Sequence, residues 1–95
     1  MNFVFDWDQD KANENLHKHS ISFREASSVF RDPLLVTLSD TEHSDDEERY
    51  WNIGYSAAKK LLVVVFTERG DVTRIISARR ANIWERKIYE NENIT

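Results

Sequence analysis

The 95-residue chain has no cysteine, only two glycines and only one proline. Without cysteine there is no disulfide framework and no thiolate metal site, and a reducing, cytoplasmic compartment is the plain expectation. So little glycine and proline leaves no flexible linker, and we expect one domain over residues 1–95. No apolar run approaches the roughly 18 residues that a membrane span needs. The first residues also lack the basic start and apolar core of a signal peptide.

The charge of the chain is unevenly distributed. The net charge of −4 argues by itself against a nucleic-acid-binding protein. Residues 1–50 hold 12 acidic and five basic side chains, however, whereas residues 51–95 hold five acidic and eight basic ones. Six of the acidic residues lie between Asp40 and Glu48. A polyanion should therefore meet the second half of the chain.

The pattern of apolar residues predicts the element order β-α-α-β-β-β-β-α. Strands are expected at residues 2–6, 34–38, 48–55, 61–66 and 72–78, and helices at residues 9–18, 23–31 and 81–90. Helices and strands that are segregated in this way indicate an α+β fold. We expect an antiparallel sheet with its central strand at 61–66, two N-terminal helices packed on one face, a short C-terminal helix and a frayed tail at 91–95.

Helix starts and buried helix faces follow from local patterns. Asp8 or Asp6 can cap the first helix, and Ser22 with Glu25 reads as a capping box for the second. Residues spaced for one apolar helix face are Ala12, Leu16 and His19 in the first helix, Phe23, Ala26 and Phe30 in the second, and Ala81, Trp84 and Ile88 in the third.

The basic run Ser77-Ala78-Arg79-Arg80 is the first candidate site. Plain strand alternation places Arg74 and Arg80 on one face and Ser77 and Arg79 on the other, with both arginines of the run where the strand gives way to the helix. An arginine offers a planar fork of donors that suits phosphate. Surface arginines more commonly pair with the protein's own carboxylates, here Glu85 or the acidic loop.

The acidic loop is the second candidate. His43 titrates near neutral pH and Glu48 can take a proton, so they are candidates for general acid–base chemistry, with Arg49 placed to orient Glu48. The spacing fits no dedicated calcium or zinc loop, so we expect no metal site. Such a run of acidic residues is most commonly a solvated loop. It can also neutralise the protein's own arginines until a substrate competes for them.

Other polar and aromatic residues give weaker signals. His17 and His19 lie about 200° apart around a helix and cannot converge on a metal. Lys11 and Lys18 share one helix face as a possible phosphate track. Tryptophans can stack on bases; Trp51 and Trp84 fit core faces better, so Trp7 is the candidate.

Taken together, these residues resemble the BrnT family of toxins from type II toxin–antitoxin pairs. The matching pieces, in chain order, are Phe5-Asp6-Trp7-Asp8 with Lys11 and Asn15, Lys18-His19 with Ser22-Phe23 and Glu25-Ala26, Val29-Phe30, Asp32-Pro33, His43-Ser44, Glu47-Glu48-Arg49, Ile53-Gly54, Leu62-Val63-Val64-Val65, Thr67-Glu68-Arg69, Arg74 through Ala81, Glu85-Arg86 and Tyr89. The ordered series is specific, although no single piece is. Ser20 departs from it, because glycine is expected after Lys18-His19.

The resemblance implies a RelE-like fold and an endoribonuclease that cleaves RNA without a metal ion or other cofactor. It also implies a BrnA-like antitoxin with a ribbon-helix-helix DNA-binding part, so that the toxin meets DNA only through its partner. The implied reaction is attack of a ribose 2′-hydroxyl on the adjacent phosphate. We assign phosphate charge to Arg79 and Arg80, acid–base roles to Glu48 or His43 with Arg49, and RNA contacts to the side chains of Arg69, Lys18, Lys11 and Trp7.

Two other functions remain open from the sequence. The acidic net charge favours a non-catalytic module that binds a small partner and tunes its DNA binding. A metal-dependent hydrolase built on His43 and the acidic run would require a divalent cation.

Overall fold

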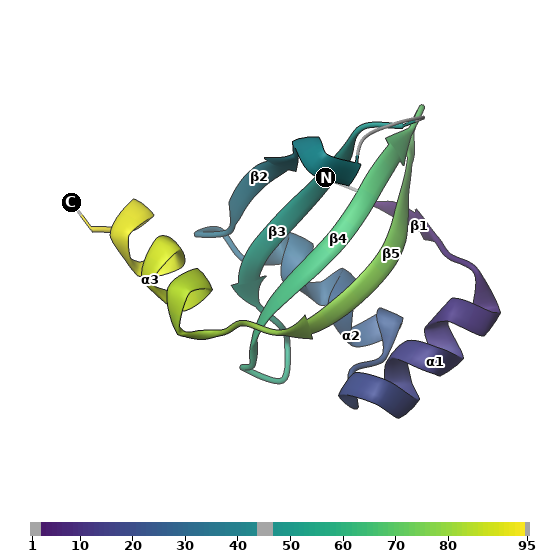
Figure 1. Ribbon diagram of the computed structural model, residues 1–95, viewed down its shortest axis with the longest axis horizontal. Coiled ribbons are helices and arrows are strands. Elements are labelled where there is room, and N and C mark those ends of the chain that lie inside the picture. Colours follow the sequence, from purple (N-terminus) through teal and green to yellow (C-terminus); the bar gives the residue numbers. More distant parts are fainter. Residues whose placement is uncertain (1–2, 44–46, 95) are drawn as a thin grey trace.

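The computed structural model describes residues 3–43 and 47–94. The strands are β1 (Val4–Asp6), β2 (Val36–Asp40), β3 (Arg49–Tyr55), β4 (Leu61–Arg69) and β5 (Val72–Arg80). The helices are α1 (Gln9–His19), α2 (Phe23–Ser28) and α3 (Ile83–Glu92), with short 3-10 helices η1 (Val29–Arg31) and η2 (Thr41–His43) (Figure 1). This is the predicted element order. Among the described residues, no helix has the length and apolar character to cross a membrane.

The sheet has the strand order β1-β5-β4-β3-β2. The apolar β4 lies at its centre, as the sequence predicts, and β4 and β5 form the expected hairpin through Gly70, whose φ is 61°. The strands β2 to β5 pair antiparallel, whereas β1 pairs parallel with β5. The sheet is therefore mixed, and the prediction of an antiparallel sheet is wrong. A strand of three residues carries no signal for its direction or its partner.

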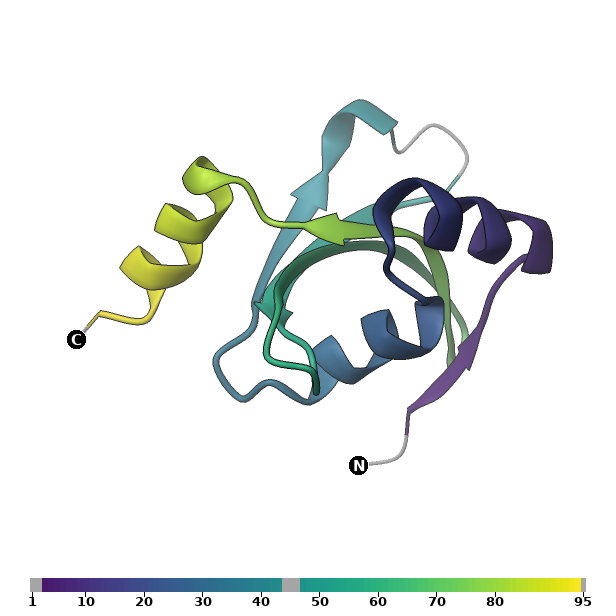
Figure 2. The same cartoon turned by 90° about the horizontal axis from the view of Figure 1, so that it is seen from below.

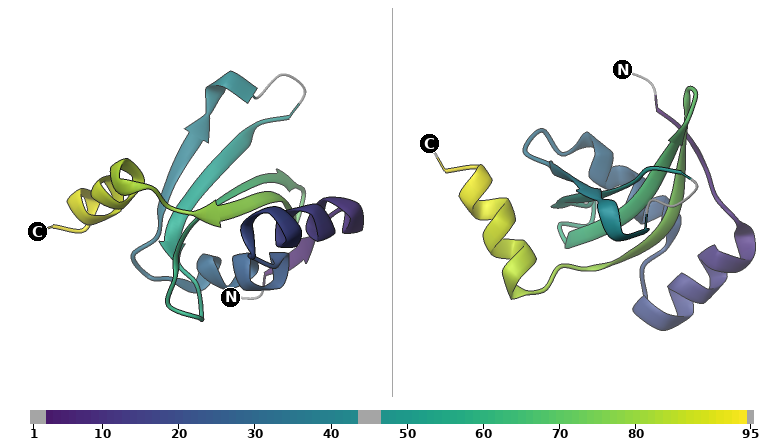
Figure 3. Two further views of the ribbon diagram at one scale, coloured as in Figure 1. Left: turned by 60° about the horizontal axis from the view of Figure 1, so that its bottom comes forward. Right: turned by 45° about the horizontal axis from the view of Figure 1, so that its top comes forward.

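The curved sheet encloses α2 on its concave side, and α1 lies beside the edge formed by β5 (Figure 2). The core on this side contains Ala12, Ile21, Phe23, Ala26, Val29, Phe30, Leu62, Val64, Phe66, Ile75 and Ala78. Because α1 sits at the edge of the sheet, the arrangement does not confirm two helices packed side by side on one face. The third helix stands away from the body at the end of β5 (Figure 3), and its Tyr89 packs with Ile53, Leu61 and Val63 on the other side of the sheet.

Helix α1 begins at an Asp8 cap, whose carboxylate accepts a 3.0 Å hydrogen bond from the Lys11 amide. It ends at Ser20, which has φ of 58° in the left-handed region where glycine is favoured. The predicted buried stripe through Leu16 is wrong: Leu16 is 52% exposed, whereas Asn15 is buried. Asn15 faces inward because its amide bonds to the backbone of β5.

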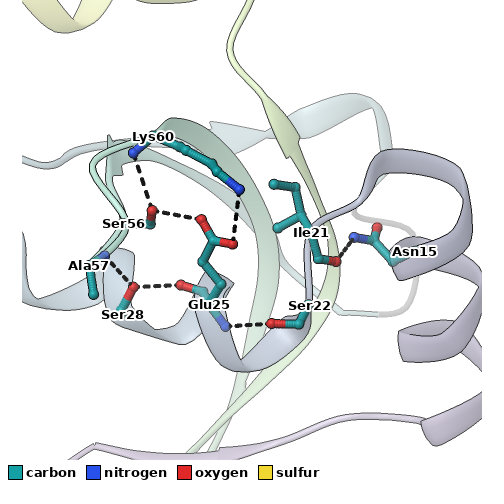
Figure 4. A network of polar contacts seen from close by, with 8 residues as sticks. All are labelled: Asn15, Ile21, Ser22, Glu25, Ser28, Ser56, Ala57 and Lys60. Carbon is teal, nitrogen blue, oxygen red and sulfur yellow. Dashed lines mark hydrogen bonds and ion pairs between the residues drawn. The ribbon is translucent and has the colours of Figure 1, made fainter.

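Helix α2 is fixed to the turn between β3 and β4 by a polar network (Figure 4). Ser22 caps the helix by accepting from the Glu25 amide at 2.9 Å. Glu25 does not complete the predicted capping box, since its carboxylate accepts from the Ser56 hydroxyl at 2.8 Å and pairs with Lys60 at 3.6 Å. These contacts lie across the concave side, so they join α2 to the sheet instead of to its own first turn.

Helix α3 buries a different face from the predicted one. Trp84 is 69% exposed and Ile88 is 36% exposed, whereas Glu85 and Tyr89 are buried. The Tyr89 hydroxyl donates a 2.8 Å hydrogen bond to Asp32. The helix is thus oriented by two polar anchors, and apolar spacing alone gives the wrong face. It continues to Glu92, two residues into the stretch expected as a tail.

Candidate functional site

The candidate site lies on the side of the sheet opposite α2, which we call the open face. The register across β3, β4 and β5 places three rows of residues there: Arg49–Thr67–Arg74, Trp51–Val65–Ser77 and Ile53–Val63–Arg79. Helix α3 covers the end of the face at Ile53 and Val63. In the first two rows, the outer residues on β3 and β5 are half-buried. Polar and aromatic side chains therefore remain accessible there.

A β-bulge brings Arg74 onto this face. Val65 pairs with Ser77 and Phe66 with Ile75, so Ile76 is an extra residue in β5. One inserted residue reverses the alternation of side chains. Arg74 therefore faces the same side as Ser77 and Arg79, and the assignment from plain alternation is wrong.

Arg79 and Arg80 are both strand residues, because β5 extends to Arg80 and α3 begins only at Ile83. They face opposite sides. Arg79 lies opposite Val63 on the open face, with its guanidinium 5.9 Å from the centre of the Trp51 ring. Arg80 lies opposite Leu62, whose side of the sheet faces α2, and its side chain is exposed.

Arg79 is held by a carboxylate from α3. It donates hydrogen bonds of 2.7 Å to each oxygen of Glu85 and one of 3.2 Å to the Arg80 carbonyl. This bonding raises the pKa of Arg79 and lowers that of Glu85, against the opposing effect of burial on each. Glu85 itself belongs to a capping box with Asn82. The remaining guanidinium donors, the Nε–H and one Nη2 proton, stay available to a ligand.

Two further arginines are also paired with carboxylates. Arg69 donates to both oxygens of Glu47 at 2.7 and 2.6 Å, which lowers the pKa of Glu47. Arg74 lies 3.3 Å from the carboxylate of Asp6 on β1. A phosphate that bound to Arg69 or Arg74 would therefore compete with a carboxylate of the protein itself, whereas one at Arg79 could use the donors that Glu85 leaves.

The predicted acid–base residues do not form one cluster among the described side chains. The Glu48 carboxylate accepts a 2.6 Å hydrogen bond from the Tyr50 hydroxyl, which raises the pKa of Tyr50. Tyr50 packs on Phe66 at 5.6 Å, on the side that faces α2, whereas Arg49 faces the open side. The backbone of His43 ends η2, and its side chain lies outside the described part, as do Asp45 and Asp46.

Helix α1 contributes two lysines beside β5. Lys11 and Lys18 are exposed and border a shallow hollow of about 250 Å³, whose other lining residues include Ile76 and Ser77. Ser77 belongs to the open face as well, so the hollow adjoins that face at the β5 edge. The hollow beside the open face therefore carries the two lysines together with one carboxylate, that of Glu14.

The tryptophans differ from their predicted positions. Trp7 is half-buried and packs edge-on against Phe23 at 6.0 Å, at the border of the core that α2 helps to form. Trp51, predicted as a core residue, is half-buried on the open face, where its indole nitrogen donates to Asp40 at 3.0 Å. Trp51 is thus the aromatic ring that lies beside Arg79 on the open face, and Trp7 is not part of this face. Alternation along β3 gave the correct face for Trp51, but not its exposure.

No metal-binding cluster of three or more histidine, aspartate or glutamate side chains forms within residues 3–43 and 47–94. The open face offers donors instead, from arginine, serine and indole groups. Such a set can hold an anion and a planar ring, and it cannot by itself take up a proton near neutral pH, because arginine stays protonated.

Comparisons with known proteins agree with this architecture. No curated protein matches the sequence. The crystal structure of the Brucella abortus ribonuclease toxin BrnT is similar, with a TM-score of 0.66 and 21% identity over 85% of this chain and 99% of that one. A family model described as the ribonuclease toxin BrnT of type II toxin–antitoxin systems matches residues 7–85. The chain therefore belongs to the BrnT family of ribonuclease toxins.

Proposed function

We propose that this protein is an endoribonuclease that cleaves RNA on the open face without a metal ion. The observation that carries the proposal is the bulge at Ile76, which puts Arg74, Ser77 and Arg79 on the face that also holds Arg49. Arg49 and Arg74 flank β4, so their backbones lie roughly 10 Å apart, two strand spacings. Two long arginine side chains can reach one phosphate across that distance.

The reaction we propose is attack of a ribose 2′-oxygen on the adjacent phosphorus. The new P–O bond forms as the bond to the 5′-oxygen breaks, which leaves a 2′,3′-cyclic phosphate and a free 5′-hydroxyl. Negative charge builds on the phosphate oxygens, and guanidinium donors fixed before the reaction stabilise that charge. Arg79 is fixed by Glu85, and Arg74 is paired with Asp6.

Two protons must also move. One leaves the 2′-hydroxyl and one reaches the 5′-oxygen. A guanidinium stays protonated near neutral pH, so it cannot accept the first and is too weak an acid to release the second. We keep Glu48 and His43 as the acid–base candidates. Glu48 directly precedes β3, and its carboxylate is held by Tyr50 on the side that faces α2, so it must release Tyr50 and turn to the open face before it can act. Trp51 can stack on a nucleobase next to the phosphate that the arginines hold.

The test uses purified protein and two RNA substrates of one sequence, one natural and one with 2′-O-methyl groups. The proposal expects cleavage of the natural RNA, products with cyclic phosphate ends, and undiminished activity in EDTA. The methylated RNA should stay intact because its 2′-oxygen cannot lose a proton. Cleavage of the methylated RNA, or loss of activity in EDTA, would contradict the proposed reaction.

We further propose a RelE-like fold, a cytoplasmic location and a BrnA-like antitoxin that carries a ribbon-helix-helix DNA-binding part. A type II family implies an antitoxin partner. Growth arrest on expression of this chain, relieved by co-expression of such an antitoxin, is the expected result.

A non-catalytic partner-binding module is the second candidate. The observation in its favour is the pairing of Arg69, Arg74 and Arg79 with the protein's own carboxylates. This candidate expects the same antitoxin complex but intact RNA at every protein concentration, so the purified RNA assay separates the two.

A further inference from the structure

The edge of β5 is only partly covered by a strand. On that side β1 pairs with Val72, Thr73 and Arg74 and then ends at Asp6. The strand β5 continues to Arg80, so its second half has no neighbouring strand on this edge within the described sheet. Ala78 is fully buried there. A buried backbone amide and carbonyl without partners would destabilise the fold considerably.

The side chain of Asn15 occupies this position. Its amide nitrogen donates to the Ala78 carbonyl at 2.8 Å, and its amide oxygen accepts from the Ala78 amide at 3.1 Å. The nitrogen also donates to the Ile21 carbonyl at 2.9 Å, the contact drawn in Figure 4. Asn15 therefore bonds to one residue of β5 in the two-bond pattern of a neighbouring strand, and ties it to the chain between α1 and α2.

Ala78 lies directly between the two residues of β5 that the proposed function uses at the centre of the open face. Ser77 precedes it and Arg79 follows it. The bulge at Ile76 is two residues away, and a bulge leaves its extra residue unpaired and interrupts the ladder locally, so contacts on the other edge of β5 help to fix the strand there. We infer that Asn15 is a positioning residue for RNA cleavage, which holds the backbone between Ser77 and Arg79 so that both side chains face the phosphate. This inference rests on the proposed function.

The chemistry of the amide explains why asparagine suits this position. A carboxamide carries both a donor and an acceptor, as a peptide group does. Aspartate at position 15 would keep the acceptor, lose both donated bonds and set a negative charge against the carbonyls of Ile21 and Ala78. Alanine would leave the Ala78 amide and carbonyl unpaired.

The test compares Asn15→Ala with Asn13→Ala, a change at an exposed asparagine of the same helix. Both proteins are assayed where thermal unfolding shows them to be folded, and hydrogen exchange of the Ala78 amide is followed by NMR. We expect faster exchange at Ala78, a kcat at least tenfold lower and a KM within twofold for Asn15→Ala only. An unchanged kcat, or a loss of activity equal to the unfolded fraction, would overturn the inference. If Asn15→Ala does not fold, Asn15→Ser, whose hydroxyl can keep one bond, takes its place under the same criteria.

A second readout separates this inference from the proposed function. The Nε–H resonance of Arg79 reports on the guanidinium and its pair with Glu85. We expect this resonance to shift or broaden in Asn15→Ala and to stay in place in Asn13→Ala. If the natural protein cleaves no RNA, the proposed function fails, and with it the part of Asn15 in RNA cleavage. A shifted resonance would still establish that Asn15 positions Arg79. An unchanged Nε–H resonance of Arg79 in Asn15→Ala would show that Asn15 does not position Arg79.

Discussion

The guanidinium of Arg79 and the carboxylate of Glu85 form a two-bond ion pair, with both distances at 2.7 Å, across the junction of β5 and α3. The carboxylate is nearly buried and the guanidinium is partly exposed. The pair therefore has two consequences. It fixes the start of α3 to the sheet, and it holds a cation on the open face with two donors still available.

Arg79 and Arg80 should differ sharply in their effect on RNA cleavage. Arg79→Ala should lower cleavage by at least about a hundredfold, the usual loss on removing one donor to transition-state charge. Arg80→Ala should stay within about threefold, because Arg80 faces the other side of the sheet. Arg79→Ala also leaves Glu85 without its cation, so the assay must run on protein shown to be folded by circular dichroism. Equal losses from the two variants would remove Arg79 from its proposed role.

Glu85 should stabilise the folded protein at neutral pH, and this contribution should be lost in acid. The bonds from Arg79 lower the folded-state pKa of Glu85 below its ordinary value of 4.5. The contribution is therefore present above that value and is lost as the pH falls through the folded-state pKa. Glu85→Gln should be less stable at pH 7 by about 1–3 kcal/mol, and its stability should fall less than that of the natural protein between pH 7 and pH 3. Urea unfolding measures both, with the exposed Glu90→Gln on the same helix as control; a parallel fall in all three proteins would contradict the prediction.

Tyr89 should make the fold sensitive to alkali. Burial and the hydrogen bond to Asp32 raise the pKa of Tyr89 from 10.0 to about 12. Its contribution to stability is therefore complete below pH 10, the pKa of an unfolded tyrosine, and is lost as the pH rises towards 12. Tyr89→Phe should lose the bond to Asp32 but show a smaller decline in urea midpoint from pH 9.5 to pH 11.5. A natural protein with no decline over this range would exclude the effect.

Much of the fold could be predicted from the sequence. The physical reasons for that success also explain which features could not be predicted. The alternation in β3 and the apolar run of β4 report burial directly. Both strands begin within a residue of their predicted starts, although β4 continues to Arg69, three residues beyond its expected end. The parallel pairing of β1 is decided by contacts distant in sequence. The bulge leaves no trace in the pattern, because Ile75 and Ile76 are both apolar and either fits an inward position.

Polar contacts explain the errors in the helices and in the site. Hydrophobic spacing favours Trp84 as the buried residue of α3, but the bonds of Glu85 to Arg79 and of Tyr89 to the distant Asp32 turn a different face of the helix towards the sheet. The apolar pattern likewise gives no sign that Asn15 is buried, since its partner Ala78 is 63 residues away. The sequence does identify the basic second half of the chain. It does not identify which arginines share a face, because that depends on the bulge.

Trp84 should contribute little to folding despite its size. Its side chain is 69% exposed, with Lys87 5.0 Å from its ring. Trp84→Ala should change the free energy of unfolding by no more than about 0.5 kcal/mol, as is usual for surface substitutions. Trp51→Ala should cost more, because that ring is half-buried between Arg79 and Asp40. Acrylamide should quench the fluorescence of Trp84 most strongly, and a larger loss of stability from Trp84→Ala than from Trp51→Ala would show the two rings to be assigned wrongly.

Glu47 should weaken RNA binding by occupying Arg69. The two side chains are both well exposed and are joined by two short hydrogen bonds, so the pair must open before Arg69 can meet a phosphate. Glu47→Gln should therefore bind RNA several-fold more tightly at low salt, with an unchanged unfolding midpoint, because exposed ion pairs contribute little to stability. The gain should shrink towards zero at about 0.5 M salt, where screening and counterion release weaken every phosphate contact. Glu42→Gln removes an exposed charge that the structure does not pair with Arg69 and serves as control. Equal gains from both variants would mean that net charge, and not the release of Arg69, governs the affinity.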